Sequence, residues 1–219
     1  MRTTMLRKTA LTIAAAAATA GGIAAPAIAA QATPGVQATA VVQADRKGHG
    51  ERQLDVRYEA QPNFYYCGPA AARNALSVQG KNIDVHTMAK QMGTTENGTD
   101  SINDITPVLN HETGTNAYKS VEINTPTADT HQTDKLRDDI TRTIDEGRAV
   151  VANIAGTTTD TTGTTHSFEG GHYISVTGYT DNGNTVTIAD SANPDHARYD
   201  LHINDLANWI ATRGYATTH

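Results

Sequence analysis

Helix-forming and strand-forming patterns are segregated along this chain, and their order constrains the fold more than any other feature. Apolar residues at helical spacing come first, and several short apolar runs typical of strands come later. The turn Asp181-Asn182-Gly183-Asn184 lies between two of these runs and predicts a hairpin. Separate helix and strand blocks favour an α+β fold with an antiparallel sheet. We therefore expect an N-terminal helical part packed on a C-terminal antiparallel sheet.

The individual elements follow from periodicity and from helix start and stop signals. Asp84 is a candidate N-cap for a helix that Gly93 would end, and Gly147 stops a later amphipathic helix. Helices are predicted over residues 67–78, 85–92, 99 or 101 to 111, 133–146 and 204–213. Strands are predicted over residues 54–58, 118–123, 149–154, 173–179 and 185–189. Between the predicted strands 149–154 and 173–179, the Thr-rich run 156–165 is interpreted as a mobile flap or a plain solvated loop.

The first 30 residues have the layout of a secretory signal peptide. Basic residues near the N-terminus precede an uncharged Ala-rich stretch that ends in small residues, and this order is typical of export signals. We divide the chain into a signal peptide over residues 1–30, a flexible leader over 31–52, and one folded domain over 53–219. The mature protein is accordingly predicted to be secreted.

Charge argues against binding to nucleic acid or to a membrane surface. The chain has a formal net charge of −6, and the predicted signal peptide contains Arg2, Arg7 and Lys8 but no acidic residue. The mature part is therefore more acidic still, and phosphate backbones and anionic lipids repel it. We expect no nucleic-acid partner, no membrane attachment of the mature form and no cofactor, and the sequence carries no signature of an oligomeric state.

Cys67 is the only cysteine of the chain, so no disulfide can form within it. It begins an Ala-rich helical pattern, where the helix dipole and the first N–H groups favour an anion such as a thiolate. Gln61 lies six residues upstream and offers a side-chain amide that, with the backbone N–H of Cys67, could bind an oxyanion. A small buried cysteine beside a surface glutamine is the alternative interpretation.

His172 and Asp190 are the candidates that would complete a catalytic site. His172 follows two glycines and precedes a buried strand pattern, which would hold a general base rigidly. Asp190 ends the next strand, and a hairpin turning at residues 182–183 brings it close to His172. A carboxylate there could orient the imidazole. Alternatively, His172 is a buried structural histidine and Asp190 caps its strand, and Asp195 is a weaker candidate for the carboxylate.

In the order Gln61, Cys67, His172 and Asp190, the chain resembles the C39-like cysteine peptidases of the papain-like group. The resemblance rests on the Cys-Gly-Pro motif in residues 61–69, on the Gly-His-Tyr motif in residues 171–179, and on residues 188–190. It implies a papain-like α+β fold and thiol acyl chemistry. In that chemistry Cys67 is the nucleophile, His172 the base and then acid, Asp190 the orienting carboxylate, and Gln61 an oxyanion-hole donor.

The resemblance predicts a secreted thiol hydrolase that cleaves peptide or peptide-like amide bonds in a peptide or protein substrate through a Cys67 thioester. Two features depart from the family: Ser191 stands where a proline commonly follows the aspartate, and no transporter segment accompanies the domain. A non-hydrolytic acyl transferase or amidase on the same fold, or a catalytically silent binding module, are the alternatives. A zinc hydrolase is disfavoured because no His-Glu-x-x-His motif is present, so no metal is expected.

Overall fold

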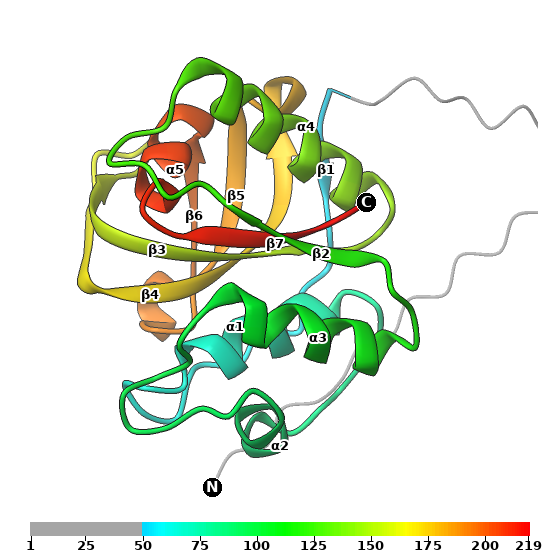
Figure 1. The fold of residues 1–219 in the computed structure, drawn as a ribbon. Coiled ribbons are helices and arrows are strands. Elements are labelled where there is room, and N and C mark those ends of the chain that lie inside the picture. The colour runs from blue at the N-terminus through cyan, green and yellow to red at the C-terminus, as the bar shows by residue number, and fades with distance from the viewer. Residues whose placement is uncertain (1–49) are drawn as a thin grey trace, which may run out of the picture. The chain divides into compact units, whose positions relative to one another are not determined.

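The computed structural model describes residues 50–219. The predicted signal peptide and nearly all of the predicted leader lie outside the described residues. Within the described part, five helices and seven strands form the fold (Figure 1). The helices are α1 (Cys67–Ser77), α2 (Val85–Gln91), α3 (Ile102–Thr113), α4 (Thr130–Asp145) and α5 (Ile203–Ile210). No helix in residues 50–219 combines the length and the apolar character needed to cross a bilayer.

All seven strands belong to one antiparallel sheet. They are β1 (Arg52–Gln53), β2 (Tyr118–Glu122), β3 (Val150–Thr159), β4 (Thr165–Thr180), β5 (Thr185–Ala189), β6 (Arg198–His202) and β7 (Gly214–Thr218). Their order is β2-β7-β3-β4-β5-β6, and β1 pairs with the end of β4. The predicted α+β fold with an antiparallel sheet is therefore confirmed.

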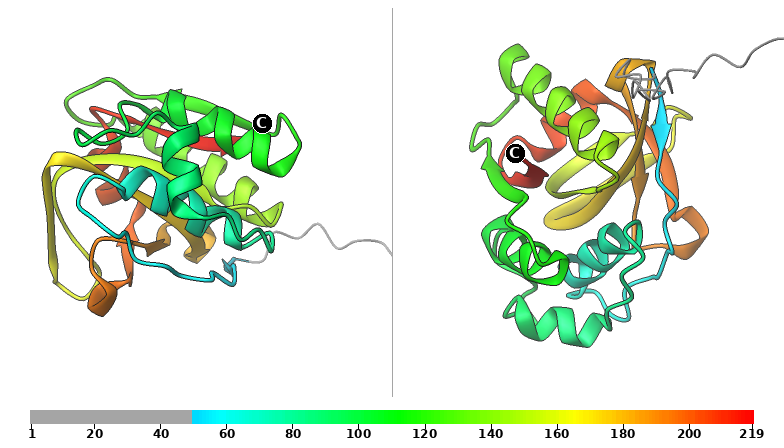
Figure 2. Two further views of the ribbon diagram at one scale, coloured as in Figure 1. Left: turned by 90° about the horizontal axis from the view of Figure 1, so that it is seen from below. Right: turned by 90° about the vertical axis from the view of Figure 1, so that its right-hand side faces the viewer.

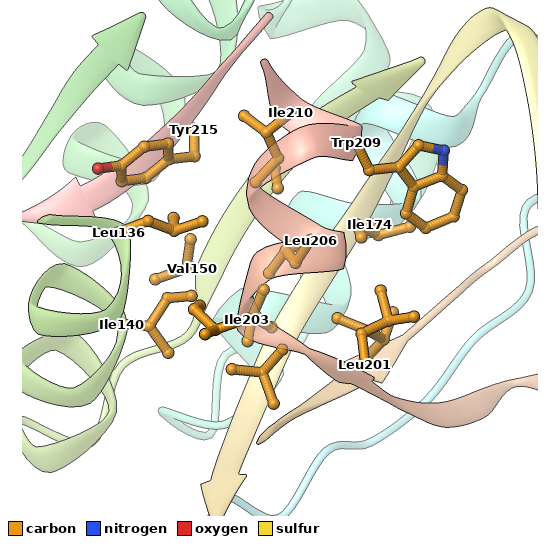
Figure 3. Packing of buried hydrophobic residues seen from close by; sticks show 14 of the residues in the cluster. Leu136, Ile140, Val150, Ile174, Leu201, Ile203, Leu206, Trp209, Ile210 and Tyr215 are labelled. Carbon is orange, nitrogen blue, oxygen red and sulfur yellow. The ribbon is translucent and has the colours of Figure 1, made fainter. Parts of the chain in front are cut away.

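Two groups of helices cover opposite faces of the sheet, as the views in Figures 1 and 2 show. Side chains alternate between the two faces of a strand, and β3 is buried on both. Val150 and Ile154 contribute to the cluster formed with α4 and α5, whereas Val151 contributes to the cluster formed with α1, α2 and α3. Figure 3 shows Leu206 of α5 among side chains from α4 and the sheet. Each fully buried aliphatic side chain contributes roughly 1.5–3 kcal/mol to this packing.

Local signals explain where the helices begin and end. Asp84 caps α2 by accepting a hydrogen bond from the Thr87 N–H, as predicted. Ser101 rather than Thr99 caps α3, where it forms a reciprocal capping box with Asp104. The same helix ends at Gly114, whose left-handed conformation suits glycine. These caps satisfy backbone groups that helix ends otherwise leave unpaired.

Two predictions about the sheet are wrong, and two strands were missed. Residues 54–58 form no strand, because the N–H groups of Arg57 and Glu59 bond to Ser77 Oγ and Asn74 Oδ1 of α1 instead of to a neighbouring strand. The run 156–165 is not a free loop: it contains the ends of β3 and β4, which pair up to the register Thr159–Thr165. Strands β6 and β7 were not predicted, and β6 proves important for the candidate site.

Candidate active site

Cys67 is the first residue of α1, and its side chain opens onto a pocket. The preceding residue, Tyr66, is the N-cap, and its carbonyl accepts the first helical hydrogen bond, from the Ala70 N–H at 3.0 Å. Cys67 is 8% exposed and packs against the cluster of α1, α2 and α3. It nevertheless lines a pocket of about 180 Å³ together with His172. The thiol therefore lies at the boundary between the core and a solvent-connected cavity.

The two residues after Cys67 explain how the helix reaches this place. A Cβ on Gly68 would lie 2.6 Å from Thr99 Oγ1, so only glycine permits this approach of α1 to the segment before α3. Pro69 stands in the first turn, where a missing N–H costs nothing. The same segment is tied to the sheet, since the Tyr173 hydroxyl donates to the Thr99 carbonyl at 3.2 Å. The Cys-Gly-Pro motif thus seats the thiol against the sheet.

A bulge in β4 comes directly before His172. In the β3–β4 ladder, one β3 residue, Ala155, faces the three β4 residues 169–171. Extra residues of this kind bend a strand and change the direction of the side chains that follow. Gly171 has a φ of 97°, a conformation that suits glycine and strains other residues. The two glycines before His172 therefore allow the strand to turn the imidazole toward the pocket.

The ring of Phe168 packs on the face of the His172 imidazole. The ring of Phe168 stacks on it with centroids 4.0 Å apart and an angle of 18° between the planes. Phe168 in turn lies 6.0 Å from the Trp209 ring, whose Nε1 donates to the Gly156 carbonyl at 3.0 Å. His172 is 4% exposed. This packing leaves the imidazole little freedom to rotate.

The carboxylate of Asp190 completes a line of three side chains. His172 Nε2 lies 2.7 Å from Asp190 Oδ1, and the Ala192 N–H donates to the same oxygen at 2.9 Å. Nε2 faces the carboxylate, which leaves Nδ1 for another partner, and the Cys67 thiol is close enough to the imidazole to raise its pKa. Thiol, imidazole and carboxylate therefore converge, and the His172–Asp190 proximity expected from the hairpin is present.

The protonation of this pair is set by burial and hydrogen bonds acting in opposite directions. Burial lowers the pKa of His172, but the hydrogen bond that it donates to Asp190 and the nearby Cys67 side chain outweigh burial and raise the pKa to about 9. Burial raises the pKa of Asp190, but hydrogen bonds from His172, Ala192 and Tyr199 leave it below its ordinary value. The pair therefore favours an imidazolium beside a carboxylate at neutral pH.

Gln61 lies next to Asp190 in space but is not among the residues that line the Cys67 pocket. Its backbone N–H donates to the Ser191 carbonyl at 3.0 Å, and its Oε1 accepts from Ser191 Oγ at 3.0 Å. Its Nε2 donates to the Asn63 carbonyl at 2.9 Å. An amide nitrogen carries two N–H groups, so this bond uses one and leaves the second for another acceptor.

The other candidates have different surroundings. Asp195 lies in a 3₁₀ turn (Pro194–His196), is exposed, and its backbone N–H bonds to Asn193 Oδ1. His166, six residues before His172, pairs with Asp160 at 3.0 Å. Within residues 50–219, no group of three or more His, Cys, Asp or Glu side chains is placed to hold a metal ion.

Sequence reasoning missed Tyr199, whose hydroxyl donates to Asp190 Oδ2 at 2.8 Å. It also missed Asn153, which lines the pocket and donates to the Tyr173 hydroxyl at 3.0 Å. Tyr199 could have been found, because residues 198–202 alternate polar and apolar and would have predicted β6. Asn153 gave no such signal, since it stands inside a continuous apolar run.

This arrangement can perform nucleophilic chemistry on a carbonyl group. It combines a thiol, a base within hydrogen-bond reach, and a carboxylate that fixes the base, which is the general layout of thiol and hydroxyl nucleophiles in enzymes. N–H groups at the start of α1 lie beside the sulfur and are suited to bind developing negative charge.

Comparisons with known proteins identify the family and the fold of this chain. A model of the Peptidase_C39 like family matches residues 53–217. A solved structure from Bacillus anthracis, described as a C39-like peptidase, has a TM-score of 0.53 and 11% identity, with 77% of this chain and 98% of that chain covered. At this identity the likeness shows the fold, and the resemblance to C39-like peptidases expected from the motifs is confirmed.

Two further solved structures align with TM-scores below 0.5. One is the peptidase domain of Streptococcus ComA, a bi-functional ABC transporter, with a TM-score of 0.49, 15% identity, and 74% of this chain and 97% of that chain covered. The other is a double glycine motif protease from an AMS/PCAT transporter in complex with its leader peptide, with a TM-score of 0.46, 11% identity, and 76% and 94% coverage. No curated protein matches the sequence.

Proposed function

This chain belongs to the Peptidase_C39 like family, and we propose that it is a thiol hydrolase that cleaves peptide or peptide-like amide bonds through a Cys67 thioester. The observation that carries the proposal is the placement of His172 between the Cys67 thiol and the Asp190 carboxylate. A buried histidine that is merely structural has no need of a thiol beside it in the same pocket. Peptide or protein is the substrate class that this chemistry and the family support.

In the proposed reaction, the thiol proton has passed to the imidazole of His172 before substrate binds, and the Cys67 thiolate attacks the scissile carbonyl carbon. The resulting imidazolium is stabilised by the Asp190 carboxylate at 2.7 Å. His172 then donates its proton to the leaving nitrogen as the C–N bond breaks, which leaves a thioester on Cys67. Water, deprotonated by the same imidazole, attacks the thioester and releases the acid.

The tetrahedral intermediates of both steps carry an oxyanion. We assign its stabilisation to the backbone N–H of Cys67 and to the second Nε2 hydrogen of Gln61. The bond from Ser191 Oγ to Gln61 Oε1 supports this role, since it fixes which end of the amide faces Ser191 and which end carries the free N–H. Losing one such donor costs about 100-fold to 1000-fold in kcat.

We also propose that the protein acts after export. The charged start, Ala-rich stretch and small-residue end of residues 1–30 support this localisation. Mass spectrometry of the protein recovered from the outside of the producing cell gives the mature N-terminus. A chain that retains Met1 there would refute signal cleavage.

The single thiol makes the main test direct, because any alkylating reagent reports on Cys67 alone. We expect iodoacetamide near pH 6 to label the native protein faster than free cysteine, because an imidazolium beside the sulfur favours the thiolate. Cys67→Ala and His172→Ala should each abolish cleavage of a peptide library. Product analysis by mass spectrometry distinguishes hydrolysis, which gives a free carboxylate, from transfer to an added amine.

Stability measurements keep this test interpretable. Both variants should keep a cooperative unfolding transition, so that loss of activity is not loss of the fold. Library cleavage by Cys67→Ala at the wild-type rate would refute the assignment, as would native-state alkylation no faster than that of a denatured sample.

A further inference from the structure

The carboxylate of Asp190 is held from both sides. Its Oδ1 accepts hydrogen bonds from His172 Nε2 at 2.7 Å and from the Ala192 N–H at 2.9 Å. Its Oδ2 accepts one from the Tyr199 hydroxyl at 2.8 Å. Asp190 is 3% exposed and Tyr199 is 8% exposed, so little water is available to replace a lost partner. The orientation of the carboxylate therefore depends on Tyr199 as well as on His172.

We propose that Tyr199 is a positioning residue of this site, which fixes the Asp190 carboxylate through its hydroxyl, and that the Asp160–His166 pair holds its ring in place. The proposal rests on the proposed function, because it assigns Tyr199 a part in orienting the His172 base. Tyr199 touches neither the thiol nor a substrate, so its effect reaches the reaction through Asp190.

The ring of Tyr199 has its own support. The imidazole of His166 stacks on it with centroids 3.8 Å apart and an angle of 20° between the planes. His166 Nε2 in turn lies 3.0 Å from Asp160 Oδ2. The His166 side chain is 10% exposed and the Asp160 side chain 5% exposed. A histidine–carboxylate pair of low exposure therefore lies against the face of the phenol that bonds to the catalytic carboxylate.

Asp160 itself is fixed by the tip of the β3–β4 hairpin. Its Oδ1 accepts hydrogen bonds from the backbone N–H groups of Thr162 and Thr164, each at 2.9 Å. The Thr161 N–H donates to the Asp200 carbonyl of β6 at 2.9 Å. These bonds connect the hairpin tip to the strand that carries Tyr199. The Thr-rich run therefore has a structural role. It fixes Asp160, which pairs with His166, and His166 stacks on the ring of Tyr199.

The ionisable groups around Asp190 agree with this assignment. Burial and the nearby Asp190 charge raise the pKa of Tyr199 far above its ordinary value, so its hydroxyl remains a donor. Tyr58 is a second phenol close enough for the Asp190 charge to raise its pKa, yet no residue in 50–219 bonds to its hydroxyl. Tyr199 is thus the phenol that holds the carboxylate.

The test compares Tyr199→Phe with Tyr215→Phe. Tyr215 is a matched control, because it is also a buried tyrosine whose hydroxyl donates to a buried aspartate, Asp139 Oδ2 at 2.8 Å, but it lies outside the site. Both variants lose one hydrogen bond to a carboxylate, so similar shifts in unfolding midpoint are expected. Only Tyr199→Phe should affect the site.

Three measurements on the full chain report on the positioning. In proton NMR, the short His172–Asp190 bond should give a downfield imidazole N–H signal that is kept in Tyr215→Phe and broadened or lost in Tyr199→Phe. Alkylation of Cys67 near pH 6 should slow about tenfold in Tyr199→Phe, which is the size expected when one hydrogen bond to a charged group is lost. With a cleaved peptide, kcat should fall about tenfold while KM stays within about twofold.

A second variant covers the case in which Tyr199→Phe does not fold. His166→Ala leaves the hydroxyl but removes the stacked ring, and we expect the N–H signal to broaden and alkylation to slow about threefold. Identical N–H signals and alkylation rates in Tyr199→Phe and Tyr215→Phe, or wild-type behaviour of His166→Ala, would overturn the proposal. The NMR signal requires no turnover, so its outcome is independent of whether Cys67→Ala refutes the proposed function.

Discussion

Replacing Gly171 with alanine tests whether the bulge before His172 depends on a glycine conformation. Gly171 has a φ of 97°, and holding another residue in a sparsely populated conformation costs about 1–3 kcal/mol. The added methyl group meets no clash, since its nearest neighbours are an Arg213 nitrogen at 3.5 Å and the Ile154 carbonyl oxygen at 3.6 Å. An alanine also lowers the entropy of the unfolded chain by about 0.4–1 kcal/mol. The net loss of unfolding free energy should therefore be about 1.3 kcal/mol at the middle of these ranges and at most about 2.6 kcal/mol.

Gly170 provides the control within the same bulge. A Cβ at this position meets no atom within 4 Å, and its φ lies outside the range that strains other residues. Gly170→Ala should therefore raise the unfolding free energy by about 0.4–1 kcal/mol, because only the entropy effect on the unfolded chain remains. Urea titration of both variants, followed by circular dichroism, measures the difference directly.

The same pair of variants should separate in activity. If Gly171→Ala relieves its strain by moving the backbone, His172 moves with it, and a misplacement of about 1 Å is worth up to about 100-fold in rate. We expect kcat to fall at least tenfold in Gly171→Ala and to stay within about threefold in Gly170→Ala. Equal stability losses in the two variants would show that the positive φ at Gly171 does not govern the bulge.

Two further predictions concern Ser191 and His172. Ser191→Ala removes the donor to Gln61 Oε1; we expect kcat to fall about threefold to tenfold, and adding Gln61→Ala should then cost less than it does in the wild type. Additive effects in this double-mutant cycle would separate Ser191 from Gln61. The raised pKa of His172, about 9 against 6.5 for the free side chain, stabilises the fold fully below about pH 6.5 and less as pH rises through 9. The stability advantage of the wild type over His172→Gln should therefore shrink by about 1–3 kcal/mol between pH 6 and pH 10, and a constant difference across this range would contradict the assignment.

Much of the fold and site could be predicted because the signals are local. The His172–Asp190 pairing followed from one turn and two strand patterns, and the structure places the two side chains 2.7 Å apart. The start of α1 at Cys67 followed from the Cys-Gly-Pro motif and the alanines after it. Caps such as Asp84 were readable because they act on the next three residues.

The features that were not predicted depend mainly on contacts between residues that are far apart in the sequence. Residues 54–58 alternate like a strand, and the Leu54 N–H does bond to Thr177 of β4. Side chains of α1 then accept from the N–H groups of Arg57 and Glu59, and no local pattern encodes that competition. The loop interpretation of the Thr-rich run depends on its lack of apolar residues. Threonine is β-branched and favours strands, which is why part of this run pairs in the sheet. Strand β7 is buried along its whole length but ends in Thr217 and Thr218, so it carries neither alternation nor an apolar run. The support of Tyr199 by His166 joins residues 33 positions apart in the sequence.

The site is split between two layers of the molecule. Cys67 belongs to a helix, whereas His172 lies in β4 and Asp190 directly follows β5. The layers are joined beside the thiol by the bond from Ser175 Oγ to the Ala71 carbonyl at 2.7 Å and by the hydrophobic cluster that Val151 and Tyr173 share with α1. The distance from sulfur to imidazole is therefore fixed by packing between the layers, and a core substitution in that shared cluster can reduce activity without touching any of the three reacting side chains.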